Sequence, residues 1–575
     1  MDSILFWNAV ALEANRVSFS DPAKAEQQGP TLSSRALAIV HLAMYDAYAG
    51  IENNTANSGG FPRYLPAPPL PPPVAPNSSI ANAVAGAAFR TLSGLYKTQR
   101  DYFESQLSCF DRNDPYFGFG MDVGSTLLKL RENDPSADAF GYMASMKRYR
   151  HRVDPDNPGQ GFHAPYYGYY SKPFASKIRH KLDKPPVLPT GNVSAEYVAA
   201  LRQVRSEGIK AELMATLPDT VGAGSAAKLF ANRRIPEETL VGIYWAYDGS
   251  IRLGTPPRFY NQIIRDLAMN TVNPQFNPPR KNNEGDNARL FAFVNAAMGD
   301  AGIFAWEQKY CHDLWRPVVG IREHDESFGP QAPHNNSNAD QRDGDAGWLP
   351  LGAPNTNNPM MKNFTPNFPA YPSGHATFGA AALHIARLFY KIPKGNRTGD
   401  NLFPRGLVSE EFNGMNRDNM GTVRPRHVRK FKGGLWDMII ENATSRVFLG
   451  VHWIFDAFDL KVTSGGEVQP DVNINNDKIG GVGLGLRIAE DIFDFGGKKA
   501  PKFSPSTADP SDEFPQLVQP ATVNNCAEPK PVKKKKDEDK KGKGERTNAD
   551  RESEMEEEMN ELRVETPYLD GVSPR

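Results

Sequence analysis

Apolar residues recur at intervals of three and four positions in several long segments of the chain. This spacing places them on one face of an α-helix, so each segment predicts an amphipathic helix. Ser33 or Ser34 is a predicted cap for the first helix, which extends to about Gly50. Alternating runs of β-branched residues are scarce, so the pattern predicts a mainly helical fold. The other predicted helices span residues 81–95, 195–205, 287–310, 375–390 and 435–450.

Long irregular segments separate the predicted helices. Residues 61–77 are rich in proline, residues 155–188 mix Pro, Gly and Tyr, and residues 327–360 are rich in Asn, Asp, Gly and Pro. Loops of this length are uncommon in compact domains and often border a functional site. After about residue 499 the composition changes to runs of lysine and acidic residues. Such runs are typical of a solvated, disordered tail.

Charge and hydropathy limit the classes of partner. The 575 residues include 66 Lys and Arg against 67 Asp and Glu, which gives a formal net charge of −1. A chain with this balance has no general electrostatic preference for nucleic acid. The most apolar stretches, near Ala380 and Ile439, are interrupted by charged residues, so we expect no membrane-spanning helix. The first residues also lack the basic and long apolar regions of an ordinary signal peptide.

Three short segments carry the candidate chemistry. They are Lys309 to Pro317, Pro372 to His375, and Ser445 to Asp456. Together they supply three fixed cations, two imidazoles, a hydroxyl and a glycine at a predicted helix start. Asp313 is the only carboxylate in the first two segments. This inventory suits a tetrahedral oxyanion, either phosphate or a phosphate-shaped metal oxide, and it suits a bound metal cation poorly.

The first two segments would present positive charge and unpaired N–H groups to one anion. Lys309 and Arg316 are seven residues apart, so on a single helix they would project from one face, about 10 Å apart along the axis. Ser373 is a predicted helix cap, and Gly374 permits close approach of a ligand to the backbone. The N–H groups at the helix start favour an anion. His375 would lie beside it and exchange a proton near neutral pH.

The third segment places a histidine near a carboxylate. Arg446 and His452 flank Gly450. Their side chains converge only if the arginine reaches far or the helix ends near Gly450. Asp456 follows His452 by four residues and could hold its imidazole in one tautomer. The other ring nitrogen could then act as a nucleophile or a metal ligand.

Each segment alone also has an ordinary structural interpretation. Lys309 and Arg316 are compatible with an exposed helix face on which Asp313 pairs with the lysine. Ser373 is compatible with a plain helix cap beside an incidental histidine, and a lone His–Asp pair is usually structural. The occurrence of all three segments in this order favours the oxyanion site. Histidines on apolar helices elsewhere, such as His41, are expected to be satisfied core residues.

The spacing of the three segments resembles a known signature. The pattern Lys-x6-Arg-Pro, Pro-Ser-Gly-His and Ser-Arg-x5-His-x3-Asp is similar to that shared by type 2 phosphatidic acid phosphatases, bacterial acid phosphatases and vanadium-dependent haloperoxidases. The surrounding sequence looks specifically like the fungal vanadium chloroperoxidases. The similarity extends from near the N-terminus to about residue 495. Matching stretches include residues 4–8, 244–250, 254–262 and 448–453.

The resemblance implies a fold and a domain organisation. The family fold is all-α, with two four-helix bundles related by pseudo-symmetry in one large domain and the site in the second bundle. We therefore expect a helical N-terminal half with the first bundle over residues 1–220. The second bundle, with the oxyanion or vanadate site, is expected over residues 221–499, and a disordered charged tail over residues 500–575.

The resemblance also implies that the cofactor is vanadate and that each site residue has a role toward it. His452 would bond the vanadium directly, and His375 would hydrogen-bond the apical oxygen and assist proton transfer. The groups that would neutralise and hold the equatorial oxygens are Lys309, Arg316, Arg446, the Ser373 hydroxyl and the Gly374 N–H.

Three further residues enter only through the resemblance. Asp248 looks like the acid that pairs with the arginine at position 446. Trp306 and Phe368 resemble the aromatic residues that line the halide side of the pocket. The algal bromoperoxidases typically have histidine where Phe368 stands, so the pocket looks like the chloride-oxidising kind.

The implied activity is oxidation of chloride and bromide by hydrogen peroxide to hypohalous acid. Vanadium would remain in its highest oxidation state as a Lewis acid, and Lys309 would polarise a peroxide oxygen. The partners would be small molecules, without nucleic acid or membrane. Secretion is also implied by the family, although no ordinary signal peptide is recognisable.

Two other functions compete with this interpretation. A soluble acid phosphatase would use the same pocket, with attack by His452 on phosphorus and protonation of the leaving alcohol by His375. The length of the chain, the lack of spanning helices and the flanking sequence favour the haloperoxidase. A passive oxyanion-binding protein would need only the cations, whereas this chain also supplies a pair of histidines.

Overall fold

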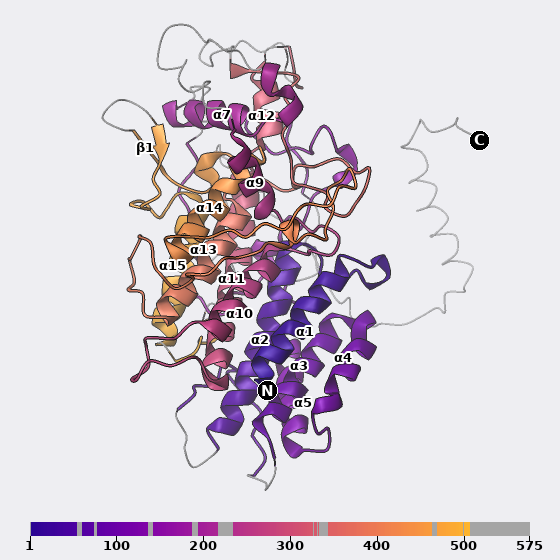
Figure 1. Cartoon of the computed structure of the whole chain (residues 1–575), viewed down its shortest axis with the longest axis vertical. Coiled ribbons are helices and arrows are strands. Elements are labelled where there is room, and N and C mark those ends of the chain that lie inside the picture. Colours follow the sequence, from indigo (N-terminus) through magenta and orange to yellow (C-terminus); the bar gives the residue numbers. More distant parts are fainter. Residues whose placement is uncertain are drawn as a thin grey trace, which may run out of the picture. The chain divides into compact units, whose positions relative to one another are not determined.

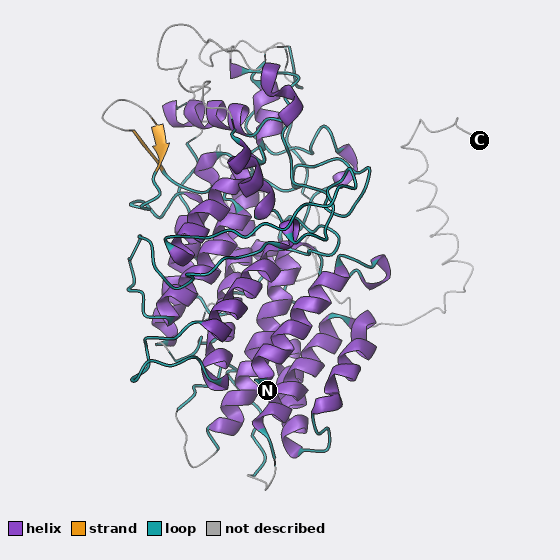
Figure 2. Ribbon diagram, viewed as in Figure 1, coloured by secondary structure: helices purple, strands orange, loops and turns teal. Residues whose placement is uncertain are grey.

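Helices account for most of the regular structure, with one two-stranded sheet among the described residues (Figure 2). The computed structural model describes residues 2–54, 60–73, 78–135, 142–186, 194–216, 234–325, 327–330, 332, 343–462, 468–497 and 499–505. These residues all belong to one compact unit. The predicted division at residues 220–221 and the predicted tail beyond residue 505 lie outside the described residues.

The first group of helices comes from the N-terminal part of the chain (Figure 1). Helix α2 packs against α3 and α5, which pack against each other, and α1 packs against α2 and α3. The bounds are α1 (Ser3–Ser18), α2 (Gly29–Glu52), α3 (Ile80–Leu95), α4 (Arg100–Gln106) and α5 (Pro115–Leu130).

The second group contains the elements that carry the three motif segments. Helix α13 contacts α10, α11, α14 and α15, so it lies at the centre of this group. The bounds are α6 (Tyr167–Tyr170), α7 (Ala195–Glu207), α9 (Pro236–Tyr244), α10 (Pro256–Asn270), α11 (Glu284–His312), α12 (Pro317–Glu323), α13 (Gly374–Phe389), α14 (Gly434–Phe448) and α15 (Gly480–Gly496).

Short elements complete the described chain. Strand β1 (Leu460–Val462) pairs antiparallel with β2 (Val468–Pro470), with Lys461 opposite Gln469. The 3₁₀ turns are η1 (Pro22–Lys24), η2 (Lys97–Gln99), η3 (Leu107–Cys109), η4 (Pro158–Gln160), η5 (Ala211–Thr216), η7 (Glu410–Phe412) and η8 (Ile454–Asp456).

Helix α11 joins the two groups because it packs against α2 as well as α13 and α15. Nearly all of its residues are buried, as expected for a helix enclosed by others. Its start is fixed by a capping box, in which the Asn283 side chain accepts from the Asp286 N–H and the Asp286 carboxylate accepts from the Asn283 N–H. Its end is set by Asp313, which adopts a left-handed conformation with φ of 51°.

Helices α13 and α15 approach each other closely through glycines of α15. A Cβ atom on Gly481 or on Gly485 would lie 2.5 Å from a backbone carbonyl oxygen of α13, that of Ser373 or of Thr377 respectively. Only glycine permits this approach without displacement of a helix. Because Ser373 and Gly374 begin α13, the same contact fixes the start of the helix that carries the second motif.

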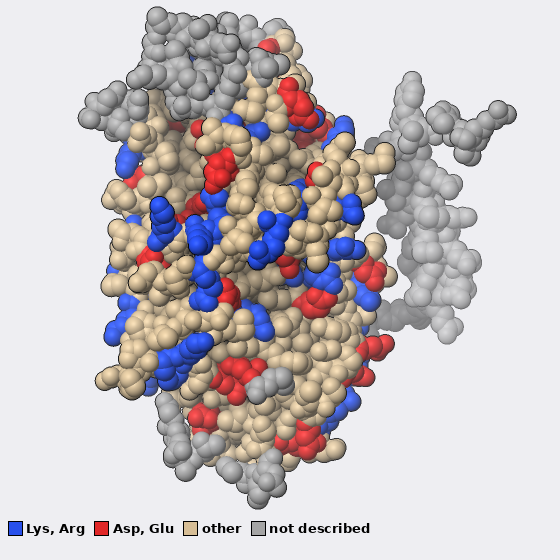
Figure 3. All heavy atoms as spheres, viewed as in Figure 1, with Lys and Arg blue, Asp and Glu red and all other residues tan. Residues whose placement is uncertain are grey.

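The all-α fold built from two helix bundles with few strands is confirmed. The predicted cap at Ser33 or Ser34 is wrong, because α2 begins at Gly29 and both serines are buried inside it. Seven described helices of seven or more residues were not indicated by the apolar pattern, namely α1, α4, α5, α9, α10, α12 and α15. None of the described helices is both long and apolar enough to cross a membrane. On the face shown in Figure 3, Lys and Arg side chains are interspersed with Asp and Glu.

Candidate active site

A cavity of about 330 Å³ lies where the three motif segments meet. Residues from both helical groups line it, because Gln28, Gly29 and Pro30 at the start of α2 contribute alongside the second group. The sequence-predicted residues in its wall are Asp248, Trp306, Phe368, Gly374, His375, Arg446 and His452. Lys309, Arg316 and Ser373 are buried around this wall.

Lys309 and Arg316 do not share a helix, contrary to the expectation from their spacing. Helix α11 ends at His312, and Arg316 is the residue that precedes α12. The left-handed residue Asp313 ends α11, and both cations still lie buried around the cavity wall. Asp313 does not pair with the lysine, since its carboxylate accepts from the Tyr142 hydroxyl at 2.7 Å.

The Lys309 ammonium is fully buried in a nest of backbone carbonyls. Its Nζ donates to the carbonyls of Pro369 (2.9 Å), Ala370 (3.1 Å) and Pro372. Burial, and then the nearby charge of Arg316, lower the pKa of Lys309 well below its usual range. Three carbonyl acceptors match the three N–H groups of the ammonium form. A bound anion would therefore share or replace one of these carbonyl contacts.

Arg316 connects the first segment to the third. Its Nε donates to the Phe368 carbonyl at 2.8 Å and its Nη1 to the Val451 carbonyl at 2.7 Å. The same Nη1 lies 2.9 Å from His452 Nε2. A guanidinium can only donate, so Nε2 accepts and carries a lone pair directed toward the cation. Burial lowers the pKa of Arg316 to about 9.

His452 and Asp456 form the pair that their spacing predicted. The helix does not continue to Asp456, because α14 ends at Phe448 and Gly450 has a φ of 72°. His452 Nδ1 nevertheless donates to Asp456 Oδ2 at 2.6 Å. Burial lowers the pKa of His452 and raises that of Asp456 to about 7. The imidazole is thus neutral, with its proton on Nδ1 and its lone pair on Nε2.

The second segment begins α13 at the cavity. Ser373 is its N-cap, as predicted, and its Oγ accepts from the Ala376 N–H at 3.4 Å. Gly374 follows, and a Cβ there would lie 3.3 Å from the Trp306 ring. His375 Nε2 donates to the Ala246 carbonyl at 2.6 Å, which leaves Nδ1 as the acceptor of the neutral ring. Burial, and then Arg446, lower the pKa of His375 to about 3.

Asp248 joins the site through a loop that the motifs do not contain. Both of its carboxylate oxygens accept from Arg446, at 2.8 and 2.9 Å, in a bidentate pair. The preceding residue, Tyr247, has a φ of 45°, an unusual conformation for an aromatic side chain. This turn lets the Ala246 carbonyl reach His375 while the next carboxylate reaches Arg446.

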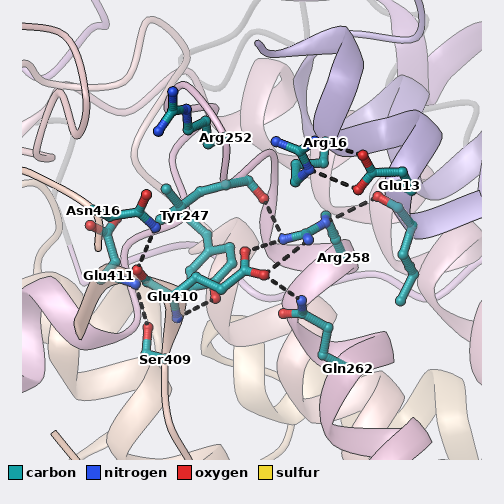
Figure 4. Close-up of polar contacts among 12 residues, drawn as sticks. Glu13, Arg16, Tyr247, Arg252, Arg258, Gln262, Ser409, Glu410, Glu411 and Asn416 are labelled. Atoms are coloured by element: carbon teal, nitrogen blue, oxygen red, sulfur yellow. Dashed lines mark hydrogen bonds and ion pairs between the residues drawn. The ribbon is translucent and has the colours of Figure 1, made fainter. Parts of the chain in front are cut away.

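The polar network in Figure 4 holds the turn at Tyr247. The Tyr247 hydroxyl accepts from the Glu410 N–H at 2.8 Å, and its ring stacks on Phe259 at 4.4 Å. The Glu410 carboxylate in turn accepts from Arg258 and from Gln262 at 3.0 Å. Helix α10 supplies Phe259, Arg258 and Gln262, so it supports the loop.

An aromatic wall faces the cations. Trp306 and Phe368 lie with ring centroids 4.8 Å apart. The Lys309 Nζ lies 5.0 Å from the Phe368 centroid, and the Arg316 guanidinium carbon lies 4.9 Å from it. These distances are within the range of cation–π attraction. A small anion beside these rings would meet an apolar surface with positive charge close by.

The donors around the cavity suit an oxyanion. Three cations, Lys309, Arg316 and Arg446, are countered by two carboxylates, Asp248 and Asp456. Two buried N–H positions, Arg316 Nη2 and Arg446 Nε, have no hydrogen-bond partner among the described residues. Buried donors of this kind are usually satisfied. An anion with several acceptor oxygens would satisfy both and offset the excess positive charge.

Sequence reasoning missed several contributors to the site. His163 lines the cavity, and its ring centroid lies 5.9 Å from that of Trp306. Its ring packs over Gly29, where a Cβ would lie 2.2 Å from it. The carbonyls around Lys309 and the support of Tyr247 were also missed. None of these has a local sequence signal, because each depends on contacts between distant segments.

Comparisons with known proteins show what the chain is similar to. Residues 1–162 match the family described as vanadium chloroperoxidase N-terminal domain, and residues 289–462 match the VCPO second helical-bundle domain. The chain is 35% identical over 591 positions to a vanadium chloroperoxidase of Curvularia inaequalis, covering 87% of this chain and 90% of that protein.

Solved structures share the fold at lower identity. A bacterial vanadium-dependent iodoperoxidase superposes with a TM-score of 0.53 at 17% identity, covering 87% of this chain and 98% of its own. A holo-type bacterial vanadium-dependent chloroperoxidase superposes with a TM-score of 0.51 at 14% identity, covering 84% and 95%. Together with the sequence identity to the fungal enzyme over nearly the whole of both chains, these findings place the chain in the vanadium chloroperoxidase family.

Proposed function

We propose that the cavity binds vanadate and that the protein uses it to oxidise chloride, and also bromide, with hydrogen peroxide. Haloperoxidase activity of the vanadium chloroperoxidase type follows from membership of the family. The proposal adds which residues of this chain hold the cofactor and which handle protons and halide. The observation that carries it is the pair of unpartnered, buried guanidinium N–H positions on Arg316 and Arg446 beside the lone pair of His452.

The chain would hold the cofactor by charge and by one direct bond. His452 Nε2, kept deprotonated by the Nδ1–H bond to Asp456, is the atom positioned to bond the metal. Arg316, Arg446 and Lys309 would neutralise the anionic oxygens, and the Ser373 hydroxyl and Gly374 N–H would add hydrogen bonds. Bound vanadate would supply Lewis-acid activation of peroxide.

Proton handling belongs to His375. Its Nε2–H is fixed on the Ala246 carbonyl, so Nδ1 is the atom that can accept a proton at the cavity. Asp248 lies 4.0 Å from the same ring and would stabilise its charged form. Trp306 and Phe368 would form the halide side, where an apolar surface close to the cations Lys309 and Arg316 favours a weakly hydrated anion.

The test is halogenation of a chlorinatable dye by metal-free protein as orthovanadate is added. We expect saturable activation in chloride and peroxide, and we expect inorganic phosphate to compete with vanadate. A His452→Ala variant should lose tight retention of vanadate in equilibrium dialysis. A His375→Ala variant should retain vanadate but lose most halide oxidation. Retention by His452→Ala at wild-type affinity would overturn the assignment of the metal-bonding atom.

The same assay distinguishes the phosphatase. No halogenation with chloride or bromide, together with phosphomonoester hydrolysis that vanadate inhibits, would assign the cavity to phosphate chemistry and overturn the proposal. Secretion stays a prediction from the family resemblance, and its test is whether the activity accumulates in the culture medium.

A further inference from the structure

Methionine is unusually prominent on the surface of this protein. Of the five most exposed large apolar side chains among the described residues, four are methionines. Met360 is 95% exposed, Met420 is 84% exposed and Met415 is 73% exposed. Apolar side chains normally gain free energy by burial, and Met44, Met298 and Met438 of the same chain are fully buried. The exposed set therefore calls for an explanation beyond packing.

Three of these methionines, with their neighbour Met361, gather on two loops that are hydrogen-bonded to each other. The Met360 N–H donates to the Asn419 carbonyl at 3.0 Å, and Asn419 Nδ2 donates to the Met361 carbonyl at 2.8 Å. We refer to Met360, Met361, Met415 and Met420 as the methionine border. Segments about 55 positions apart in the chain thus bring four thioethers to one region of the surface.

The two loops of the methionine border are anchored on segments that line the active-site cavity. Phe364 lines the cavity only three residues after Met361, so the two backbones are at most about 11 Å apart. Asn357 Nδ2 donates to the Ile251 carbonyl at 2.7 Å, next to the cavity-lining turn at Gly249.

The second loop is anchored in the same way. Asn416 Nδ2 donates to the Glu410 carbonyl at 2.7 Å, and the Glu410 N–H donates to the hydroxyl of cavity-lining Tyr247. Figure 4 shows Asn416, Glu410 and Tyr247 together. Both loops of the methionine border are therefore hydrogen-bonded to segments that adjoin the cavity wall, the second through two successive hydrogen bonds.

The cavity wall itself contains no sulfur. The described residues that line it include aromatic, proline, glycine, histidine and amide side chains, and neither methionine nor cysteine is among them. An oxidant formed beside His375 and Arg446 can thus leave the cavity without contact with a thioether. The methionine border supplies exposed thioethers on loops anchored beside the cavity wall, and thioethers are readily oxidised side chains.

We propose that the methionine border is a site of oxidative modification, at which hypohalous acid released by the enzyme converts thioethers to sulfoxides. The proposal rests on the haloperoxidase function. In each event a sulfur–oxygen bond forms and the oxygen–halogen bond breaks. The halogen leaves as halide with the bonding electron pair, and the proton goes to water. Sulfur loses two electrons and the halogen gains two, so one hypochlorous acid is consumed for each sulfoxide and chloride produced.

The test is mass spectrometry of peptides from vanadate-loaded enzyme after a limited number of turnovers with chloride and peroxide. Met269 is the internal reference, because it is 40% exposed and lies on α10, which begins at cavity-lining Pro256. Thirteen helical residues separate the two, or about 20 Å. A parallel sample of the inactive His452→Ala variant receives reagent hypochlorous acid at the same total dose, which measures the intrinsic reactivity of each methionine.

For each methionine we divide the sulfoxide yield during turnover by the yield with reagent hypochlorous acid. We expect this ratio to be about fivefold or more higher at the methionine border than at Met269. Peroxide without halide should give no such excess. Equal ratios at the border and at Met269, with dye halogenation intact, would overturn this inference and leave the haloperoxidase function standing. Absence of dye halogenation would instead count against the function on which the inference rests.

Discussion

At the scale of single residues, the chemistry available to the site depends on which donor and acceptor atoms already have hydrogen bonds. His452 has one ring nitrogen bound to Asp456 and the other held as a lone pair beside a guanidinium. Motif spacing predicted this pair, because His and Asp four residues apart often meet. Motif spacing could not predict the three carbonyls around Lys309. It also could not predict that Arg446 donates two hydrogen bonds to Asp248. Those contacts join segments far apart in the chain, and only the family resemblance indicated Asp248.

Replacement of Asp456 by Asn should weaken cofactor binding more than it alters the fold. The amide retains the shape but not the charge that orients the His452 ring, so we expect vanadate affinity to fall about 10- to 100-fold. Equilibrium dialysis and vanadate titration of halogenation measure the change. Asp494→Asn, which removes a surface carboxylate paired with Lys394, is the control and should bind as wild type. Equal affinity in both variants would exclude the orienting role.

The Tyr247 hydroxyl should contribute measurably to stability. Tyr247→Phe keeps the ring that stacks on Phe259 but leaves the Glu410 N–H without its acceptor. We expect a loss of about 1 kcal/mol in the free energy of unfolding, measured by urea denaturation. Tyr116→Phe is a matched control, since that tyrosine is also buried and its hydroxyl has no hydrogen bond to the described residues. A loss no larger than that of the control would contradict the role of the hydroxyl.

At the scale of elements, helix ends proved harder to predict than helices. The apolar pattern located α11, α13 and α14, but it gave no reason for α11 to stop at His312. The stop depends on the left-handed Asp313, whose carboxylate binds Tyr142 from a distant loop. The apolar pattern did not predict α15, for a different reason. Its glycines lower helix propensity, and tight packing against α13 overrides that penalty.

The surroundings of two helical glycines predict opposite effects for their replacement by alanine. Gly485→Ala would force a methyl group against the Thr377 carbonyl, so we expect a loss of about 1–3 kcal/mol and weaker vanadate binding as α13 shifts. Gly118→Ala, on the exposed side of α5 with nothing within 4 Å, should be neutral or stabilise by about 0.5–1 kcal/mol. Thermal unfolding and vanadate titration measure both variants. A stable Gly485→Ala protein with wild-type affinity would show that α13 does not depend on this contact.

At the scale of the whole molecule, the core contains histidines that remain neutral. His41 donates from Nδ1 to the Leu37 carbonyl at 2.7 Å and accepts from Asn8 at 2.9 Å, so it is satisfied in the core as predicted. Burial lowers its pKa to about 4, and it lowers those of His163 and His384 to about 4 as well. In the unfolded chain each would titrate near 6.5. Between these values the unfolded state binds more protons, so stability falls as the pH falls from about 6.5 to about 4.

His41→Gln should reduce this dependence on pH. Each depressed histidine costs up to about 3 kcal/mol across the interval, so the variant should lose less stability than wild type between pH 7 and pH 4.5. Denaturant unfolding at the two pH values measures the difference. Leu42→Ala, on the same helix and equally buried, is destabilised without a titrating group and should keep the wild-type dependence. An unchanged dependence in His41→Gln would place the acid sensitivity elsewhere.

The unpartnered guanidinium N–H positions of Arg316 and Arg446 also bear on how stable the protein is under natural conditions. A group that binds only the folded state stabilises it in proportion to the logarithm of its concentration, by about 2.7 kcal/mol at a hundred times its dissociation constant. Vanadate and phosphate would compete for the same cavity, and either one would stabilise the folded state when bound. The supply of a trace element relative to a common nutrient would then govern how many molecules work and also how long each one survives.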